Sequence, residues 1–340
     1  MTLAAPATLA AADTPKGVPL LEARNLKTWF PVIGGVLRKT IGHVKAVNDV
    51  SFSVGTGEVL SVVGESGCGK STLGYSILGL TLPTDGTLSL AGNPIDIRKA
   101  SSWSPYRRDF QIIFQDPYTS LNPRQTVFEL LAEPLRAHGL CSAKELPDRV
   151  AGLLGKVGLS PDYMHRFPHA FSGGQRQRIG IARAIGLQPK LIVCDEVVAA
   201  LDVSVQAQII RLLMDLKSEL GLSLLFISHD LSLVKAISDR VLVMYLGRIA
   251  EAAASPDLFA RPRHPYTAAL LASIPTLDRG RRPKLLGGEI PSPVDLPPGC
   301  AFAGRCPRVR DRCRQEIPVL TAADASAAAC FFPLGLPPLP

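Results

Sequence analysis

One stretch of the chain combines glycines, a lysine and a hydroxyl in the order that binds a triphosphate. Residues 64–71 read G-E-S-G-C-G-K-S and fit the pattern G-x-x-x-x-G-K-[ST]. Glycines let the backbone wrap phosphates with its amides, and the N-terminus of the following helix adds partial positive charge. Lys70 would reach the β- and γ-phosphates, and Ser71 would offer its hydroxyl to Mg²⁺. The residues expected to contact the nucleotide are Gly64, Glu65, Ser66, Gly67, Cys68, Gly69, Lys70, Ser71 and Thr72.

Two carboxylates, Asp195 and Glu196, come directly after the apolar run 191–194. Because α/β proteins bind their ligands at the carboxyl ends of strands, we expect both near the nucleotide. Asp195 would hold Mg²⁺ through water, and Glu196 would orient or deprotonate the water that attacks the γ-phosphate. The alternative is a buried strand that ends in a capping acid.

Two further apolar runs deliver polar side chains to the same edge. Residues 110–114 precede Gln115, whose amide can bind metal and water, and residues 225–227 precede His229, whose imidazole can sense the γ-phosphate. The expected catalytic residues are Gln115, Glu196 and His229, and the expected Mg²⁺ ligands are Ser71, Gln115 and Asp195.

A second anion site is predicted in residues 171–178, which read F-S-G-G-Q-R-Q-R. Ser172 is placed to cap a helix, and Gly173 and Gly174 leave backbone amides bare. Because the chain already has a phosphate loop, the simplest use for this site is to close on the nucleotide of another subunit. A glycine-rich turn that begins a surface helix is the alternative.

Four cysteines near the C-terminal end form a third group of possible ligands. They are Cys300, Cys306, Cys313 and Cys330, spaced C-x5-C-x6-C-x16-C. Four thiols suit a closed metal centre, and spacing alone leaves zinc and an iron–sulfur cluster equally open. Unmetallated surface thiols are the alternative. Cys68, Cys141 and Cys194 lack such grouping, so we expect ordinary buried thiols there.

The elements that position these groups alternate between strand and helix up to about residue 250. Apolar strands are predicted near Leu60, Ile112, Leu191, Leu224 and Val241. This order indicates an α/β fold with a mostly parallel sheet. Strands are absent from the pattern between residues 115 and 179, which predicts a helical insert at about 116–180. We expect a disordered tail at 1–17, a nucleotide-binding domain at 18–255 and a loop-rich, cysteine-containing unit at 256–340.

Composition narrows the classes of partner. The 340 residues carry a net charge of +8, with basic side chains gathered at 279–284 and 305–314. Acidic residues interrupt this cluster and no aromatic pattern accompanies it, so we expect a solvated or partner-facing surface and no nucleic acid. No apolar run approaches the 18 or so residues of a membrane span, so we do not expect an integral membrane protein.

Taken in order, these motifs resemble the ATP-binding subunits of ABC transporters, over residues 20–250. Asp202 belongs to the same pattern. The segments 43–47, 114–123 and 264–267 resemble the branch that imports oligopeptides and dipeptides. The resemblance implies an ABC-type P-loop ATPase with a RecA-like core, an antiparallel β subdomain and a helical subdomain, followed by a small cysteine domain. Ser172, Gly173, Gly174, Gln175 and Asp202 would then serve nucleotide shared between two subunits.

The resemblance also implies cofactors and partners. The cofactors would be ATP, Mg²⁺ and a four-iron four-sulfur cluster on the four cysteines. The partners would be a second ATPase subunit, forming a heterodimer, two permeases reached through residues 115–123, and an extracytoplasmic peptide-binding protein. The protein would lie peripherally on the cytoplasmic face of the cell membrane. Alternative cargoes are nickel chelates and oligosaccharides; alternative functions are a soluble ABC ATPase and a redox-sensing iron–sulfur protein.

The chain departs from the family pattern at three places. Val197 stands where the family usually has Pro, and Ala199 where it has Ser. Glu196 is retained, so hydrolysis is predicted. The family also has an aromatic residue near the position of Ile41 that stacks on adenine, and the nearest rings in this chain are His43 and Phe30.

Overall fold

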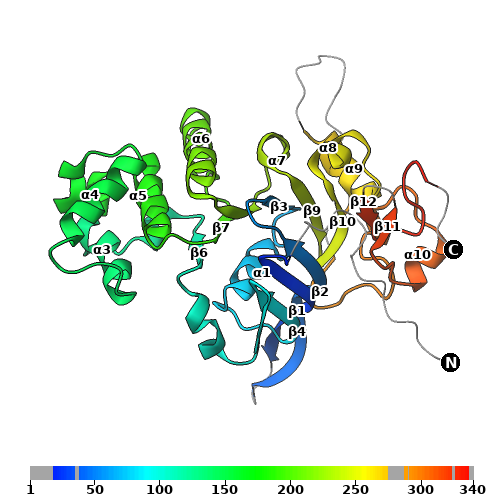
Figure 1. Ribbon diagram of the computed structural model, residues 1–340. Coiled ribbons are helices and arrows are strands. Elements are labelled where there is room, and N and C mark those ends of the chain that lie inside the picture. Colours follow the sequence, from blue (N-terminus) through cyan, green and yellow to red (C-terminus); the bar gives the residue numbers. More distant parts are fainter. Residues whose placement is uncertain (1–17, 35–37, 275–286, 290, 324–325, 337–340) are drawn as a thin grey trace. The chain divides into compact units, whose positions relative to one another are not determined.

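The computed structural model describes residues 18–34, 38–274, 287–289, 291–323 and 326–336 (Figure 1). The predicted tail at 1–17 and the basic residues at 279–284 lie outside these ranges. The chain divides into two units. The first unit comprises Met1–Gly55, Val59–Ser102 and Ser228–Pro340, and the second comprises Thr56–Glu58 and Trp103–Ile227.

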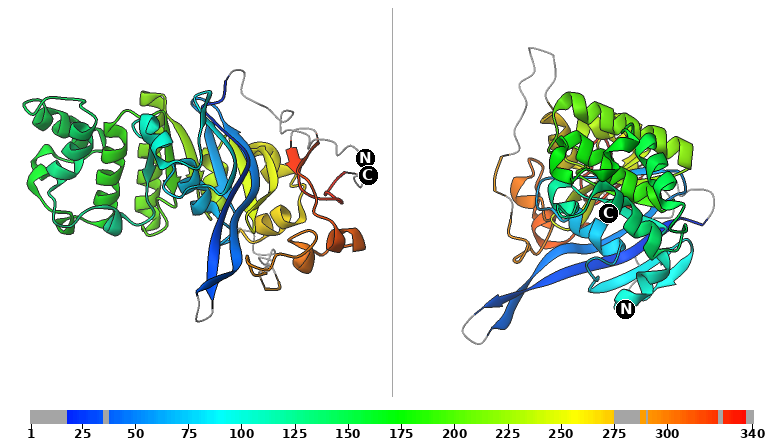
Figure 2. Two further views of the ribbon diagram at one scale, coloured as in Figure 1. Left: turned by 90° about the horizontal axis from the view of Figure 1, so that it is seen from below. Right: turned by 90° about the vertical axis from the view of Figure 1, so that its left-hand side faces the viewer.

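The first unit contains an antiparallel sheet in the order β2-β1-β4-β5. Its strands are β1 (Leu21–Gly34), β2 (Lys39–Val54), β4 (Asp85–Leu90) and β5 (Asn93–Ile95). Figure 2 shows the long hairpin of β1 and β2 extending away from the shorter strands of its sheet. Residues Leu21, Ala23, Leu26 and Thr28 of β1 are buried, which gives one face of the sheet a core side. This sheet is the antiparallel β subdomain expected from the sequence.

Five further strands of the first unit follow the order β11-β12-β10-β9-β3. They are β3 (Val59–Val63), β9 (Arg240–Tyr245), β10 (Arg248–Ala254), β11 (Thr321–Ala323) and β12 (Ser326–Ala328). Strand β3 is buried along its whole length and pairs with β9 in parallel, whereas the other neighbours are antiparallel. The strands predicted near Leu60 and Val241 are therefore confirmed.

Helices of the first unit are short and follow the strands closely. They are α1 (Lys70–Ile77), α7 (Leu231–Ile237), α8 (Ser255–Ala260), α9 (Pro265–Ala272) and α10 (Asp311–Gln315), with a 3₁₀ turn η4 at Ala303–Arg305. Helix α7 begins at Asp230, whose carboxylate accepts hydrogen bonds from the amides of Ser232 and Leu233. Helix α1 begins at Lys70, within the predicted phosphate loop at 64–71, so the loop spans the turn from β3 to the first residues of α1.

The second unit carries a parallel sheet in the order β8-β7-β6 and a group of helices. Its strands are β6 (Phe110–Ile113), β7 (Leu191–Asp195) and β8 (Ser223–Ile227). Its helices are α2 (Pro117–Ser120), α3 (Val127–Ala137), α4 (Leu146–Lys156), α5 (Gly173–Gly186) and α6 (Val203–Leu220). The segment between β6 and β7 contains helices and no strand, as predicted, and α3, α4 and α5 gather together in Figure 1.

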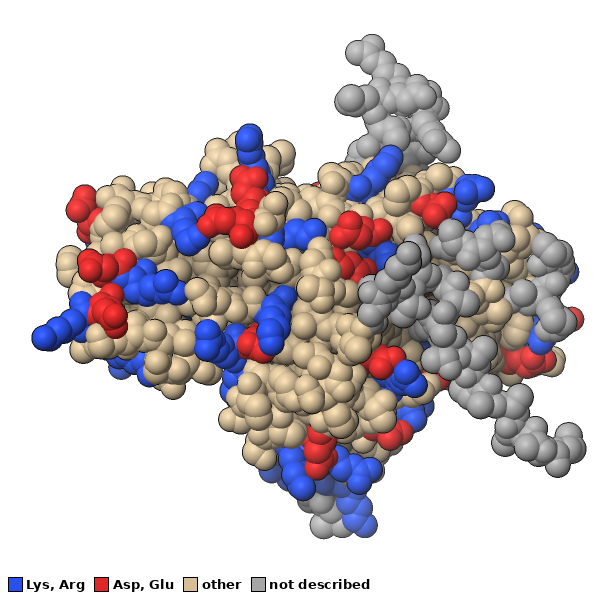
Figure 3. Space-filling view, in the orientation of Figure 1, with Lys and Arg blue, Asp and Glu red and all other residues tan. Residues whose placement is uncertain are grey.

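The described surface mixes charges of both signs. On the face drawn in Figure 3, basic and acidic side chains are interspersed, without a continuous basic band among the described residues of that face. A continuous basic stripe is the electrostatic footprint of a nucleic-acid site. None of the described helices combines the length and apolar character needed to cross a membrane.

A buried carboxylate joins β10 to the start of α9. Glu251 has no exposed surface, and its two oxygens accept hydrogen bonds from the backbone amides of Arg263 and His264, both at 2.8 Å. His264 in turn accepts from the amide of Tyr266 through Nδ1 at 3.0 Å, which caps α9. The turn before α9 is therefore fixed by side-chain acceptors.

We expect Glu251→Ala to lower the free energy of unfolding by about 2–4 kcal/mol, because two buried amides lose their acceptors. The exposed carboxylate of Asp85 pairs with Lys27 at 2.8 Å on the antiparallel sheet and serves as the control. Asp85→Ala removes only a surface ion pair, worth up to about 1 kcal/mol. Urea unfolding followed by circular dichroism measures both; equal losses would contradict the role given to Glu251.

Candidate functional site

The predicted phosphate loop lies in the first unit, between β3 and α1. Lys70 is buried, and its ammonium donates to the carbonyls of Gly64 at 2.8 Å and Glu65 at 3.0 Å. Helix α1 has Gly69 at its N-cap, which offers no side chain to cap the first amides. Those amides and the helix dipole make this end of α1 suited to an anion.

Two glycines of the loop are required by close backbone contacts. Gly69 has φ +105°, and a Cβ there would lie 1.9 Å from the carbonyl oxygen of Ala46 on β2. Gly64 has φ +155°, and its Cβ would lie 2.2 Å from the carbonyl oxygen of Met244 on β9. The loop backbone is therefore pressed against neighbouring strands on two sides, which only glycine permits.

Glu65 is bound by residues far along the chain. Its carboxylate accepts two hydrogen bonds from Arg305, at 2.7 and 2.8 Å, and its amide donates to the hydroxyl of Tyr266 at 2.9 Å. The side chain of Arg305 is only 4% exposed. The expectation that the basic residues at 305–314 are solvated or partner-facing is thus wrong for Arg305, because Glu65 of the phosphate loop is its partner.

The predicted carboxylates lie in the second unit, at the end of β7. Asp195 is the last residue of β7 and is buried. Glu196 follows in the left-handed region with φ +46°, and its carboxylate accepts a hydrogen bond from Nε2 of Gln115 at 2.8 Å. A non-glycine residue in that region is strained and often marks a functional position. The structure thus brings Gln115 and Glu196 together, as the shared strand edge predicted.

The turn after Glu196 is closed without the proline that the family pattern contains. The amide of Ala199 donates to the carbonyl of Glu196 at 3.0 Å, and Val197 is buried. Asp202 lies at the N-cap position of α6.

The second anion motif begins helix α5 in the same unit. Ser172 accepts from the amide of Gln175, and the Gln175 side chain accepts from the amide of Ser172, which completes a capping box. Arg176 follows, buried, with its guanidinium 3.8 Å from the ring centroid of Tyr118 in α2. The predicted helix start is confirmed; the contact between Arg176 and Tyr118 has no local signature in the sequence.

His229 lies in the first unit, exposed, between Ser228 and the cap of α7. The predicted site residues are therefore divided. The first unit carries residues 64–72 and His229, and the second carries Gln115, Asp195, Glu196, the motif at 172–175 and Asp202.

The rings near the expected adenine position form their own contacts on the β1–β2 hairpin. His43 lies 6.2 Å from Trp29, centroid to centroid, and the ammonium of Lys45 lies over the Trp29 ring. Phe30 is 40% exposed.

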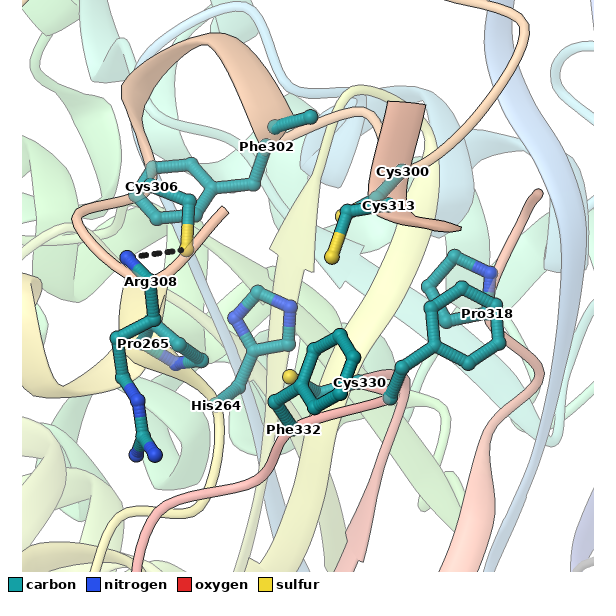
Figure 4. Close-up of a pocket in the computed structure, with 12 residues that line it drawn as sticks. His264, Pro265, Cys300, Phe302, Cys306, Arg308, Cys313, Pro318, Cys330 and Phe332 are labelled. Carbon is teal, nitrogen blue, oxygen red and sulfur yellow. Dashed lines mark hydrogen bonds between the residues drawn. The ribbon is translucent and has the colours of Figure 1, made fainter. Parts of the chain in front are cut away.

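The four C-terminal cysteines line one small cavity (Figure 4). His264, Phe302, Phe331 and Phe332 complete much of its wall. The sulfur of Cys306 accepts from the amide of Arg308 at 3.4 Å. Of the other thiols, Cys68 and Cys194 are buried as expected, whereas Cys141 is half-buried.

The donor set of this cavity is soft, because it consists of thiols. Burial raises the pKa of both the Cys300 and the Cys330 thiol to about 11. A soft cation that binds there would release these protons. As the side chains stand, no group of three or more His, Cys, Asp or Glu residues among the described residues could hold a metal ion.

Two family models match separate parts of the chain. The family model of the ABC transporter matches residues 47–199, and the model of the oligopeptide/dipeptide transporter C-terminal region matches residues 250–313. The chain is 49% identical over 319 residues to the oligopeptide transport ATP-binding protein OppF of Salmonella typhimurium, covering 92% of this chain and 96% of that protein. It is 47% identical to the dipeptide transport ATP-binding protein DppF of Haemophilus influenzae, covering 94% and 98%.

The fold of this chain is also similar to that of a solved structure. The ATP-binding cassette MJ0796, in a dimeric post-hydrolysis state bound to ADP and Pi, matches with a TM-score of 0.61 and 26% identity, over 69% of this chain and 98% of that one. The fold and the site define an ABC-type ATPase, and the chain belongs to the ABC transporter family of ATP-binding proteins. Within that family, its relatives are the ATP-binding proteins of oligopeptide and dipeptide transport.

We expect Gly69→Ala to destabilise the protein by about 3 kcal/mol or more, because its Cβ would overlap the Ala46 carbonyl. Gly67→Ala is the matched control. Gly67 has φ +77°, but nothing lies within 4 Å of the point that a Cβ would occupy, so only backbone strain of about 1–2 kcal/mol remains. Urea unfolding of the two variants separates crowding from backbone strain. Equal midpoints would show that the contact with β2 is not a constraint.

Proposed function

We propose that this chain is the ATP-hydrolysing motor subunit of an ABC importer for peptides. One observation supports the proposal most strongly. The same chain contains the phosphate loop, the capped helix at Ser172 and the Gln115–Glu196 pair, and it is similar to peptide-transport proteins over more than nine-tenths of its length. ATP binding would close two such subunits, and hydrolysis would reopen them. The energy is transmitted to membrane permeases.

Within the phosphate loop, Lys70 would leave the carbonyls of Gly64 and Glu65 for the β- and γ-phosphates. Mg²⁺ would be held by Ser71, Gln115 and Asp195, directly or through water, and it would neutralise charge on the phosphates. Glu196 would take the proton of the attacking water, with Gln115 and His229 orienting the reacting groups. The amide of Gln115 already bonds the Glu196 carboxylate, which supports a shared role.

Ser172, Gly173, Gly174 and Gln175 would bind the nucleotide held by a second ATPase subunit. The N-terminus of α5, which begins with Gly173 and Gly174, supports an anion site there. The dimeric state of MJ0796 bound to ADP and Pi supports an arrangement in which two subunits share nucleotide, with Asp202 near their junction. We propose that the partner subunit is a different chain, so that the motor is a heterodimer.

Residues 115–123 would transmit the closure to two permeases, which receive cargo from an extracytoplasmic peptide-binding protein. Helix α2 in this segment is tied to α5 by Arg183, whose guanidinium donates to the carbonyl of Ser120 at 2.8 Å, and by the stacking of Arg176 on Tyr118. Movement of α5 towards nucleotide would therefore also move α2. This function places the chain peripherally at the cytoplasmic face of the cell membrane.

The C-terminal cavity is proposed to hold a four-iron four-sulfur cluster through Cys300, Cys306, Cys313 and Cys330. Four thiols on one cavity are the donor set of such a cluster, and arginines nearby, among them Arg308, would offset its negative charge. Zinc is the alternative. When bound, the cluster would supply a cross-link between distant parts of the C-terminal segment. We accordingly propose a nucleotide-binding domain at 18–255, with a helical insert at about 116–180, and a cysteine domain at 256–340.

We expect Glu196→Gln to lower ATP turnover at least about 100-fold, because the general base is lost, while ATP binding persists. With its permeases and partner present, the variant would accumulate a closed, nucleotide-loaded dimer. Phosphate release, nucleotide binding and size-exclusion chromatography measure the three quantities. Glu219→Gln on the exposed face of α6 is the control and leaves turnover unchanged. Wild-type turnover in Glu196→Gln, or a motor that stays monomeric with ATP, would contradict the proposal.

We expect the double variant Cys300→Ser, Cys306→Ser to lose bound iron and acid-labile sulfide, because two of four ligands are removed. Anaerobic purification, metal and sulfide analysis, and visible absorption measure the cluster. Cys141→Ser is the control, since Cys141 does not line the cavity. Iron and sulfide that persist in the double variant would exclude this ligand set, and zinc without sulfide in the wild type would favour the alternative.

A further inference from the structure

Glu65 of the phosphate loop is held through every polar group it has. Its amide donates to the Tyr266 hydroxyl, its carbonyl accepts from Lys70, and its carboxylate accepts twice from Arg305. Arg305 lies 240 residues further along the chain. The position of this loop residue is therefore set from the C-terminal segment as well as from the loop itself.

Arg305 is itself fixed in place. Its Nε donates to the carbonyl of Gly287 at 3.1 Å, its Nη1 also donates to the hydroxyl of Tyr245 at 3.3 Å, and its guanidinium lies over the ring of Phe302. A planar guanidinium with a bidentate carboxylate partner has a defined orientation, which a lysine would not reproduce. The pair is thus a rigid connection between η4 and the loop.

The connection continues into the cysteine cavity. Arg305 directly precedes Cys306, and Phe302 and His264 line the cavity. Phe302 packs on Tyr266 and Tyr245 with ring centroids 5.3 and 5.4 Å apart. Tyr266 also accepts a hydrogen bond from the Glu65 amide. Glu65 is therefore contacted both by this aromatic cluster and by Arg305.

A second contact of the C-terminal segment lies beside the loop. The amide of Lys45 on β2 donates to the carbonyl of Pro293 at 3.2 Å. The next residue, Ala46, provides the carbonyl against which Gly69 is pressed. Pro293 and Arg305 therefore support the phosphate loop near both of its ends.

The negative charge of Glu65 explains why its pairing with Arg305 matters for nucleotide binding. A carboxylate in a loop that binds a triphosphate would repel the ligand, with little screening at short range. Arg305 neutralises that carboxylate and holds it on the side of the C-terminal segment. We propose that Arg305 is a positioning residue of the ATP site, which couples the C-terminal cysteine segment to ATP affinity.

The inference rests on the proposed ATP site and adds a regulation to it. Any change that displaces η4, such as loss of a group bound by Cys306, would release Glu65 and weaken ATP binding. The motor would then reach its full ATP affinity only when the cysteine domain is correctly assembled.

The test measures the Kd for ATP and the kcat and KM of hydrolysis in the full chain with its partner subunits. We expect Arg305→Gln to raise both Kd and KM about tenfold, with kcat changed less than about threefold, because one charge-assisted pair is lost before chemistry begins. Arg305→Lys would recover part of the loss. Arg261→Gln removes an exposed arginine that pairs with Asp257 at 3.3 Å and leaves all three constants unchanged.

A second substitution separates positioning from a general packing role. In Glu65→Gln, Arg305→Gln the unpaired carboxylate is gone, so we expect ATP to bind more tightly than to Arg305→Gln alone. If Arg305 only stabilised the C-terminal fold, adding Glu65→Gln would give no recovery. That result, or a Kd of Arg305→Gln within twofold of wild type, would overturn the inference. Failure of the wild-type chain to bind ATP would instead overturn the proposed function.

Discussion

The close approach of the phosphate loop to its neighbouring strands is the constraint on which the site depends. Gly69 lies against the Ala46 carbonyl of β2, and Gly64 lies against the Met244 carbonyl of β9. These contacts fix a loop that leads into the N-terminus of α1, and a helix N-terminus suits an anion. A side chain at either position would push the loop away from the strands, so the geometry of the anion site follows from backbone packing.

The predicted site residues are divided between the two units of the chain. The phosphate loop and His229 belong to one unit, whereas the Gln115–Glu196 pair and the capped helix at Ser172 belong to the other. Within the second unit, Arg176 and Arg183 both link α5 to α2, so the anion motif and the segment proposed to meet the permease form one mechanical element.

The C-terminal segment is an integral part of the nucleotide-binding unit. Strand β12 pairs with β10, Glu251 of β10 fixes the turn before α9, and Arg305 and Tyr266 reach Glu65 of the loop. These contacts connect the C-terminal segment to β10 and to the phosphate loop. The four cysteines line a cavity in the same segment.

The sequence by itself determined the groups that act over short range. Glycine spacing, apolar runs that end in polar residues and the Ser172–Gln175 capping pattern depend on neighbours a few residues away, so they predicted the loop, the strands β3, β6, β7, β8 and β9, and the start of α5. It also placed Gln115 and Glu196 on one strand edge. The Arg305–Glu65 pair and the Arg176–Tyr118 contact were decided by the tertiary structure alone. Each joins side chains that no local pattern relates. Charge composition therefore predicted a solvated or partner-facing Arg305, whereas folding buries its side chain against Glu65 of the phosphate loop.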